Sequence, residues 1–157
     1  MAESAQAVTA LSLLRSGVSL QLFGLIWGYT VALTPFPKLA LTAHIQSMTQ
    51  GSMILGVGLL LRQSNLLKLS PLELTITWWG FALAWPAVIV QCFNAFWGTN
   101  RLLKITAASA GANGAKAWQE ETVFLTLMLS GLVLIGSFTV ILLALFREQK
   151  QSTKKLK

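Results

Sequence analysis

The sequence predicts an all-α fold, an integral membrane four-helix bundle, on three observations. Charged residues make up 11% of the 157 residues and hydrophobic residues 54%, whereas an average soluble domain carries about 25% charged residues. The apolar residues gather into four long stretches separated by polar segments. The 12 basic residues outnumber the 5 acidic ones and concentrate at the end of the chain. This pattern excludes a soluble globular domain and a disordered chain, and nucleic acid is not expected as a partner.

Each of the four stretches is long enough to cross a bilayer, which takes about 20 apolar residues in a helix. They cover about residues 17–34, 42–61, 73–97 and 121–146. We expect a cytosolic segment at 1–16, the membrane domain at 17–146 and a basic tail at 147–157. The first stretch has no basic region before its apolar core, since the first basic residue is Arg15. It is therefore expected to be a retained helix rather than a signal peptide.

The connections between the stretches carry turn and capping signals. Two prolines set a short turn at residues 35–38. Ser70 is followed by Pro71 and then by Glu73, which is the pattern of a capping box at a helix start. The third connection, residues 98–119, is the longest and is rich in Gly and Ala. Loops of this length are uncommon unless they are functional or disordered.

The distribution of Lys and Arg predicts the orientation. Four spans place both termini on one side of the membrane together with the connection at 62–71, and that side carries eight of the 12 basic residues. The other side carries four, so the positive-inside rule predicts that both termini are cytosolic.

Small residues and one proline predict how the helices pack. Gly24 and Gly28 form a Gly-xxx-Gly pair in the first span, and Gly51 and Gly58 lie two turns apart in the second. Small residues let helices approach closely in lipid. Pro86 lies in the middle of the third span and predicts a kink there.

The single histidine, His44, lies early in the second span. A histidine within a span usually faces the protein interior, and it either bonds to a helix carbonyl or serves as a ligand or base. One histidine cannot build a zinc or copper site alone, but it can be the one protein ligand of a haem. Ser47, Met48 and Gly51 share its helix face. The small residues would leave room for a macrocycle, and equally for a neighbouring helix.

Amides are the other polar groups of the spans. Gln50, Gln91 and Asn94 either bond across helices or orient a polar group on an apolar substrate. The sequence contains no Asp, no phosphate-binding loop and no nucleophile motif. Hydrolysis, phosphoryl transfer and nicotinamide chemistry are therefore disfavoured.

Two blocks resemble the hydroxylaminobenzene mutase and styrene oxide isomerase family. The first is Ala43-His44 with Gln50-Gly51, and the second is Trp97-Gly98-Thr99, the Gly/Ala-rich loop and Ala117-Trp118-Gln119-Glu120. The resemblance implies a four-helix membrane isomerase with ferric haem b at a subunit boundary of a trimer. It implies His44 as the iron ligand, and the shared helix face would then place Ser47 and Gly51 beside the cofactor. It also implies an intramolecular rearrangement of a small apolar substrate in which the iron acts as a Lewis acid on oxygen.

Two features bear on the branch of that family. The epoxide isomerases have a tyrosine in the third helix, where this chain has only Gln91, Cys92 and Asn94 nearby. The block Trp118-Gln119-Glu120 is similar to the mutase branch. We expect Gln50 and Asn94 to act on the substrate, with Gln91 also in contact with it. The alternatives are a non-catalytic four-helix membrane protein, such as an assembly factor or a transporter subunit, and a haem electron carrier that uses Met48 as a second axial ligand.

Overall fold

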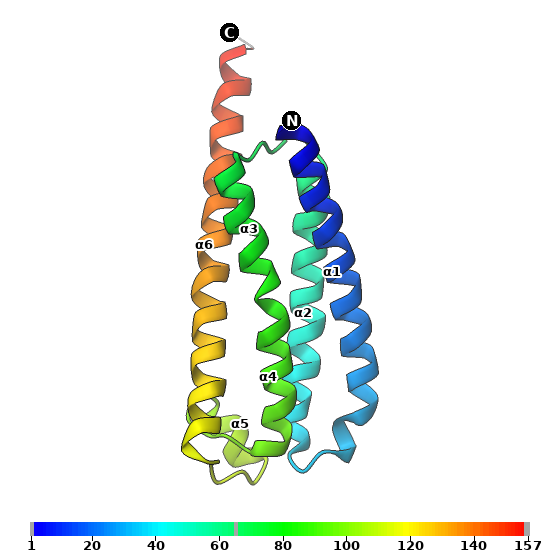
Figure 1. The fold of residues 1–157 in the computed structure, drawn as a ribbon, viewed down its shortest axis with the longest axis vertical. Helices are drawn as coiled ribbons and strands as arrows, with labels where there is room; N and C mark the ends of the chain where they lie inside the picture. Colours follow the sequence, from blue (N-terminus) through cyan, green and yellow to red (C-terminus); the bar gives the residue numbers. More distant parts are fainter. Residues whose placement is uncertain (1, 65, 156–157) are drawn as a thin grey trace.

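The computed structural model describes residues 2–64 and 66–155, and every regular element in these residues is a helix. The elements are α1 (Ala2–Thr30), η1 (Val31–Leu33), α2 (Pro37–Leu61), α3 (Pro71–Ala82), α4 (Ala84–Trp97), α5 (Lys104–Ser109) and α6 (Ala117–Lys155). The long helices run up and down side by side, with α3 and α4 forming one broken rod and both termini at the same end (Figure 1). The prediction of an all-α helix bundle is confirmed.

Three helical segments are long and apolar enough to cross a membrane. They are Ala5–Leu33, Pro71–Trp97 and Ala117–Gln149. The chain is therefore a membrane protein. Helix α2 has 25 residues but is not among these segments, so the count of four spans and the cytosolic position of the termini stay predictions.

The helices run past the predicted spans at several ends. Helix α1 continues through residues 2–16 and α6 through 147–155, because neither segment contains a Gly or Pro to stop it. Pro37 lies at the first position of α2 rather than in a turn. The connection at 98–119 contains the short helix α5. The ends of the apolar stretches therefore marked the expected membrane boundaries but not the helix ends.

Helices α1 and α2 pack closely because glycines face each other or small side chains. A Cβ added to Gly17 would lie 2.9 Å from the carbonyl oxygen of Gly51. A Cβ added to Gly24 would lie 2.5 Å from Ser47 Oγ. A methyl group would meet the backbone of α2 at Gly17 and the side chains of Ser47 and Met48 at Gly24, so the small residues predicted to mediate packing do so here.

The break between α3 and α4 falls at Leu83, three residues before Pro86. Proline has no backbone N–H, so the carbonyl of Ala82 loses its usual partner and the helix is interrupted one turn before the proline. Both sides of the break are tied to α1 by indole groups. Trp78 Nε1 donates to Ser12 Oγ at 3.2 Å, and Trp85 Nε1 donates to Ser16 Oγ at 2.9 Å. Trp85 is thereby held against α1 by a hydrogen bond as well as by packing.

The connections at both ends of the bundle are held by polar side chains. Ser70 and Glu73 form the predicted capping box of α3, and Arg147 of α6 donates to Glu73 Oε1 at 3.0 Å. At the opposite end, Glu120 accepts hydrogen bonds from backbone N–H groups of Asn100, Arg101 and Ala115, each at 3.0 Å. One carboxylate thus pins the connection between α4 and α6 at two separate points.

Candidate functional site

His44 lies on the side of α2 that faces α1. Its Nδ1 is 2.8 Å from the carbonyl oxygen of Gly24, and its ring lies against Gly28, where an added Cβ would be 3.0 Å from Nδ1. A carbonyl only accepts hydrogen bonds, so Nδ1 carries the proton and Nε2 of the neutral ring keeps its lone pair. Among the described residues, none bonds to Nε2, and the side chain is half-buried. A ring fixed through Nδ1–H with a free Nε2 is the arrangement found in metal-ligating histidines.

The small residues one and two turns from His44 are in contact with α1. Ser47 is fully buried, and its hydroxyl donates to the carbonyls of Ala43 at 2.9 Å and His44 at 2.8 Å. Gly51 is buried against Gln21 of α1. Within one chain this small face seats a neighbouring helix. The roles of Ser47 and Gly51 beside a cofactor stay predictions.

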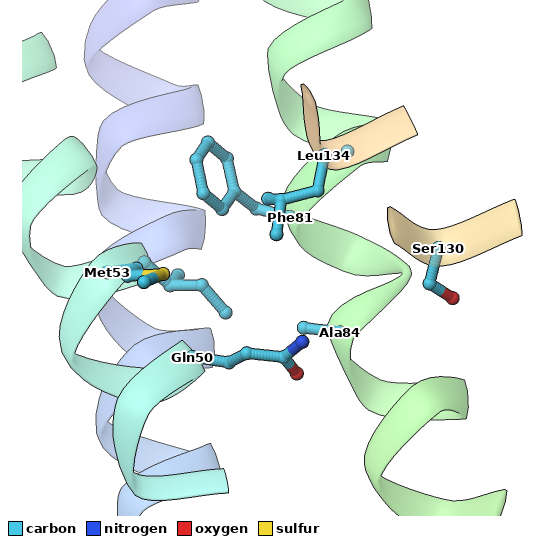
Figure 2. Close-up of a pocket in the computed structure, with 8 residues that line it drawn as sticks. Gln50, Met53, Phe81, Ala84, Ser130 and Leu134 are labelled. Atoms are coloured by element: carbon cyan, nitrogen blue, oxygen red, sulfur yellow. The ribbon is translucent and has the colours of Figure 1, made fainter. Parts of the chain in front are cut away.

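Gln50 extends from another side of α2 toward the break in the third helix. Figure 2 shows its amide reaching toward Ala84 of α4, with Ser130 of α6 on the far side. The group lines a cavity of about 10 Å³, which is room for a single water. Its Oε1 is buried and has no hydrogen-bond partner among the described residues. An unpaired buried amide oxygen costs stability, so it is a candidate binding group.

Asn94 is in a different situation, because both ends of its amide are engaged. Its Oδ1 accepts from the backbone N–H of Thr99 at 2.9 Å and from the Thr99 hydroxyl at 2.7 Å. Its Nδ2 donates to Gln91 Oε1 at 3.2 Å. The side chain is fully buried and holds the turn at Gly98, whose φ of 70° lies in the left-handed region. The contacts of Asn94 and Gln91 are thus with each other and with the loop, and their roles at the substrate stay predictions.

The chain does not bring His44 and Gln50 together on one face. Gln50 is the sixth residue after His44, and at about 100° per residue the two side chains point roughly 120° apart around α2. His44 contacts α1, whereas Gln50 lines a cavity with α3, α4 and α6. Within the described residues, no three His, Cys, Asp or Glu side chains gather into a metal-binding cluster. A metal held here would need most of its ligands from a cofactor.

Of the residues that line the Gln50 cavity, only Gln50 was predicted from the sequence, and the unpredicted ones include two on α6. Ser130 is 7% exposed, and Leu134 lies one turn further along α6. A serine beside Gly131 in an apolar helix looks like a packing residue, and nothing in its neighbourhood along the chain distinguishes it. Its position opposite Gln50 follows only from how α6 packs on α3 and α4.

The comparisons with known proteins decide the family. The family model described as styrene oxide isomerase matches residues 9–146. The chain belongs to the styrene oxide isomerase family. No curated protein and no solved structure gives a match. The matched region contains α2, α3 and α4 completely and most of α1 and α6, so the predicted resemblance is confirmed at the level of this family. Membership in the styrene oxide isomerase family implies an isomerase, and the mutase branch stays a prediction.

Proposed function

We propose that this protein is a haem-dependent membrane isomerase. Its reaction is the intramolecular rearrangement of a small apolar substrate that bears oxygen, either an aryl hydroxylamine to an aminophenol or an epoxide to a carbonyl compound. The family match supports the isomerase class. The observation that supports haem b is the hydrogen bond from His44 Nδ1 to the Gly24 carbonyl, which leaves Nε2 free to bind iron.

His44 would hold the iron, and its neighbours would keep the ring in place. The Gly24 carbonyl fixes the tautomer and the orientation of the ring and makes Nε2 a better ligand. When bound, ferric haem supplies a Lewis acid toward the substrate oxygen. Gln50 would accept or donate a hydrogen bond to the polar group of the substrate. The apolar side chains around it exclude water, so a reactive intermediate is not hydrolysed.

Homo-oligomerisation, as a trimer, is part of this proposal. His44 and Gln50 face different directions on one copy of α2, so one chain does not offer both to the same substrate. A second copy placed against the half-buried His44 side would supply the other wall of the cofactor site. A trimer with both termini in the cytosol also fits the common end of the termini (Figure 1) and the eight basic residues predicted on that side.

The proposal is less compatible with an electron carrier that uses Met48. Met48 lies four residues after His44 on the same helix, where the two side chains are neighbours about 5–6 Å apart at Cβ. His44 would hold the haem, and Met48 would lie beside His44 on the same side of it, which does not favour a haem held by both residues of one chain.

The test is an absorption spectrum of the detergent-purified chain expressed with haem supply. We expect a Soret band that His44→Ala removes and that added imidazole restores in the same variant. Restoration by imidazole separates loss of the ligand from loss of the fold. Gln46→Ala, two residues away on the same helix and on a different face, serves as the control and keeps the band. An enzyme that isomerises either substrate class without haem would overturn the cofactor, and a haem-loaded chain inactive on both classes would overturn the activity.

A further inference from the structure

Arg15 is a charged side chain on the outer face of an apolar helix. It is exposed, and it lies within Ala5–Leu33, one of the three segments long and apolar enough to cross a membrane. Its surface neighbours one turn away along α1 are Leu11 and Val18, which are 46% and 56% exposed. Charged groups in spanning helices usually face the protein interior and are paired there. An arginine among outward-facing apolar side chains therefore requires a partner.

Contacts with the bent rod of α3 and α4 fix the level of Arg15 along the bundle. The two tryptophans that bond to α1 do so at Ser12 and Ser16, on either side of Arg15. Arg15 is therefore level with the helix break, where α3 ends at Ala82. Ala82 is the ninth residue after Glu73, which pairs with α6 at the end of its apolar stretch, and nine residues of helix correspond to about 14 Å. The backbone of Arg15 thus lies deep in a bilayer core of about 30 Å.

The chain has no anion to offer Arg15 at this depth. Within the part of the chain that the structure describes, both ion pairs lie at the ends of the bundle and neither includes Arg15. Arg15 also makes no hydrogen bond or ring contact with other described residues. The five acidic residues of the sequence leave positions 4–72, 74–119 and 122–147 without one, so a second copy has no carboxylate to supply here. The counter-ion must come from outside the protein.

The anions available in a membrane are lipid phosphates and the carboxylates of a cofactor. Gly24, whose carbonyl bonds to His44, is the ninth residue after Arg15 and lies about 180° around α1 from it. A cofactor held by His44 is therefore on the opposite side of α1. The Cα–Cβ bond of Arg15 tilts toward the helix N-terminus, so its long stem carries the guanidinium toward the headgroups at the end of the bundle with both termini (Figure 1). These directions favour a lipid phosphate.

A groove between α1 and α3 begins beside Arg15 and extends toward the same end. Its volume is about 320 Å³, within the range of pockets that bind small molecules. Trp78 lines the groove and bonds to Ser12, which is the surface neighbour of Arg15 one turn away. The lining combines an indole and two hydroxyl groups with apolar side chains: Ala5, Thr9, Pro71, Leu74, Thr75 and Trp78. Such a lining fits the glycerol and ester region of a lipid, the level at which tryptophan is enriched in membrane proteins.

We propose that this groove binds one anionic phospholipid, with its phosphate on Arg15 and its glycerol between α1 and α3. A guanidinium suits this ligand because its planar donors match two phosphate oxygens. A headgroup without an ammonium is preferred, since an ammonium competes with Arg15 for the phosphate. The lipid neutralises a cation that is costly in the bilayer. Binding requires neither haem nor turnover, so this site is independent of the proposed function.

The first test counts bound lipids by native mass spectrometry of the full chain in dodecyl maltoside, a detergent without phosphate. We expect one tightly bound phosphatidylglycerol per chain and weaker binding of phosphatidylcholine with the same acyl chains. Arg15→Gln should lower the affinity for phosphatidylglycerol roughly tenfold or more, whereas Arg15→Lys keeps the charge and should lose less. Arg62→Gln is the matched control, because Arg62 is an exposed arginine at the same end of the bundle but outside the groove. Equal losses in Arg15→Gln and Arg62→Gln, or no loss in either, would overturn the proposal.

The second test examines the groove and the competing anion. Thr75→Phe fills the groove without changing Arg15 and should lower the affinity for phosphatidylglycerol, whereas Leu72→Phe, at an exposed position of α3 outside the groove, should not. Circular dichroism of each variant separates loss of lipid from loss of the fold. Unchanged lipid binding in folded Thr75→Phe would overturn the groove as the site. Unchanged lipid binding in Arg15→Gln together with loss of the Soret band would overturn the lipid and assign Arg15 to the cofactor of a neighbouring copy.

Discussion

The two sides of α2 that face α1 and α6 use polar groups in opposite ways. Toward α1, glycines bring the backbones together, and the polar atoms of Ser47 and His44 Nδ1 are bonded to helix carbonyls. Toward α6, Met53 and Leu134 line a cavity beside Gln50, whose Oε1 has no partner among the described residues. A membrane helix gains stability where its polar atoms are satisfied. The unsatisfied oxygen therefore makes the α6 side of α2 the candidate binding side.

The largest effect on the free energy of unfolding is expected for Asn94, whose amide is hydrogen-bonded at both ends and lies on neither of these two sides of α2. Asn94→Leu leaves the N–H and hydroxyl of Thr99 and the Oε1 of Gln91 without partners. We expect destabilisation by about 3 kcal/mol, since each buried unpaired group costs about 1–3 kcal/mol. The measurement is the free energy of unfolding in mixed micelles with increasing SDS. A change of sign would show that Asn94 is a binding group like Gln50.

The next largest loss of stability is expected at the contact between α1 and α2. Gly17→Ala places a methyl group against the backbone of α2, with the Gly51 oxygen at 2.9 Å. We expect a loss of about 2 kcal/mol in the same unfolding assay, in the range for overpacking a close contact. Gly56→Ala is the matched control, because a Cβ there meets nothing within 4 Å. If both variants unfold alike, the α1–α2 contact is looser than described.

A stabilising change is expected on the α6 side. Gln50→Leu removes an unpaired buried amide and replaces it with an apolar group of similar size. We expect the free energy of unfolding to rise by about 1 kcal/mol while isomerase activity falls. A gain in stability together with a loss of activity is characteristic of binding residues and is not expected for packing residues. Loss of stability in Gln50→Leu would mean that the amide has a structural partner.

The smallest effects on the free energy of unfolding are expected when a single hydroxyl group is removed from either side of α2. Ser47→Ala removes a buried oxygen at the α1 contact, and we expect a loss of about 0.5 kcal/mol because its hydrogen bonds are to its own helix. Thr49→Ala, which removes an exposed hydroxyl of α2, is expected to be neutral in the unfolding assay.

Much of the fold is readable from the sequence, because length, hydropathy and capping are local properties. The helical stretches, the capping box at Ser70 and the break before Pro86 all follow from neighbouring residues. The helical extensions at residues 2–16 and 147–155 cannot be read from neighbouring residues, because a polar helix and a polar coil have similar compositions. The short helix α5 is likewise hidden in a segment rich in Gly and Ala.

The candidate site is only partly readable, because its properties depend on partners distant in sequence. His44 stands out as the single histidine, but its free Nε2 depends on the Gly24 carbonyl of another helix. Gln50 and Asn94 are equivalent in the sequence and differ in the structure. The difference arises because the turn at Gly98 brings Thr99 back onto Asn94, and no comparable turn lies near Gln50. Ser130 enters the site only through the packing of α6.

The hydrogen bonds of Trp78 and Trp85, one on each side of the break, limit how the rod formed by α3 and α4 can move. Trp78 of α3 and Trp85 of α4 each bond to α1. The two halves of the rod are therefore held separately, and the bend between them is fixed and does not act as a hinge. Helix α6 is bonded to the same rod at two points, because Ser137 donates to the Ile76 carbonyl at 3.0 Å and Arg147 donates to Glu73 Oε1 at 3.0 Å. The bent rod therefore couples α1 to α6.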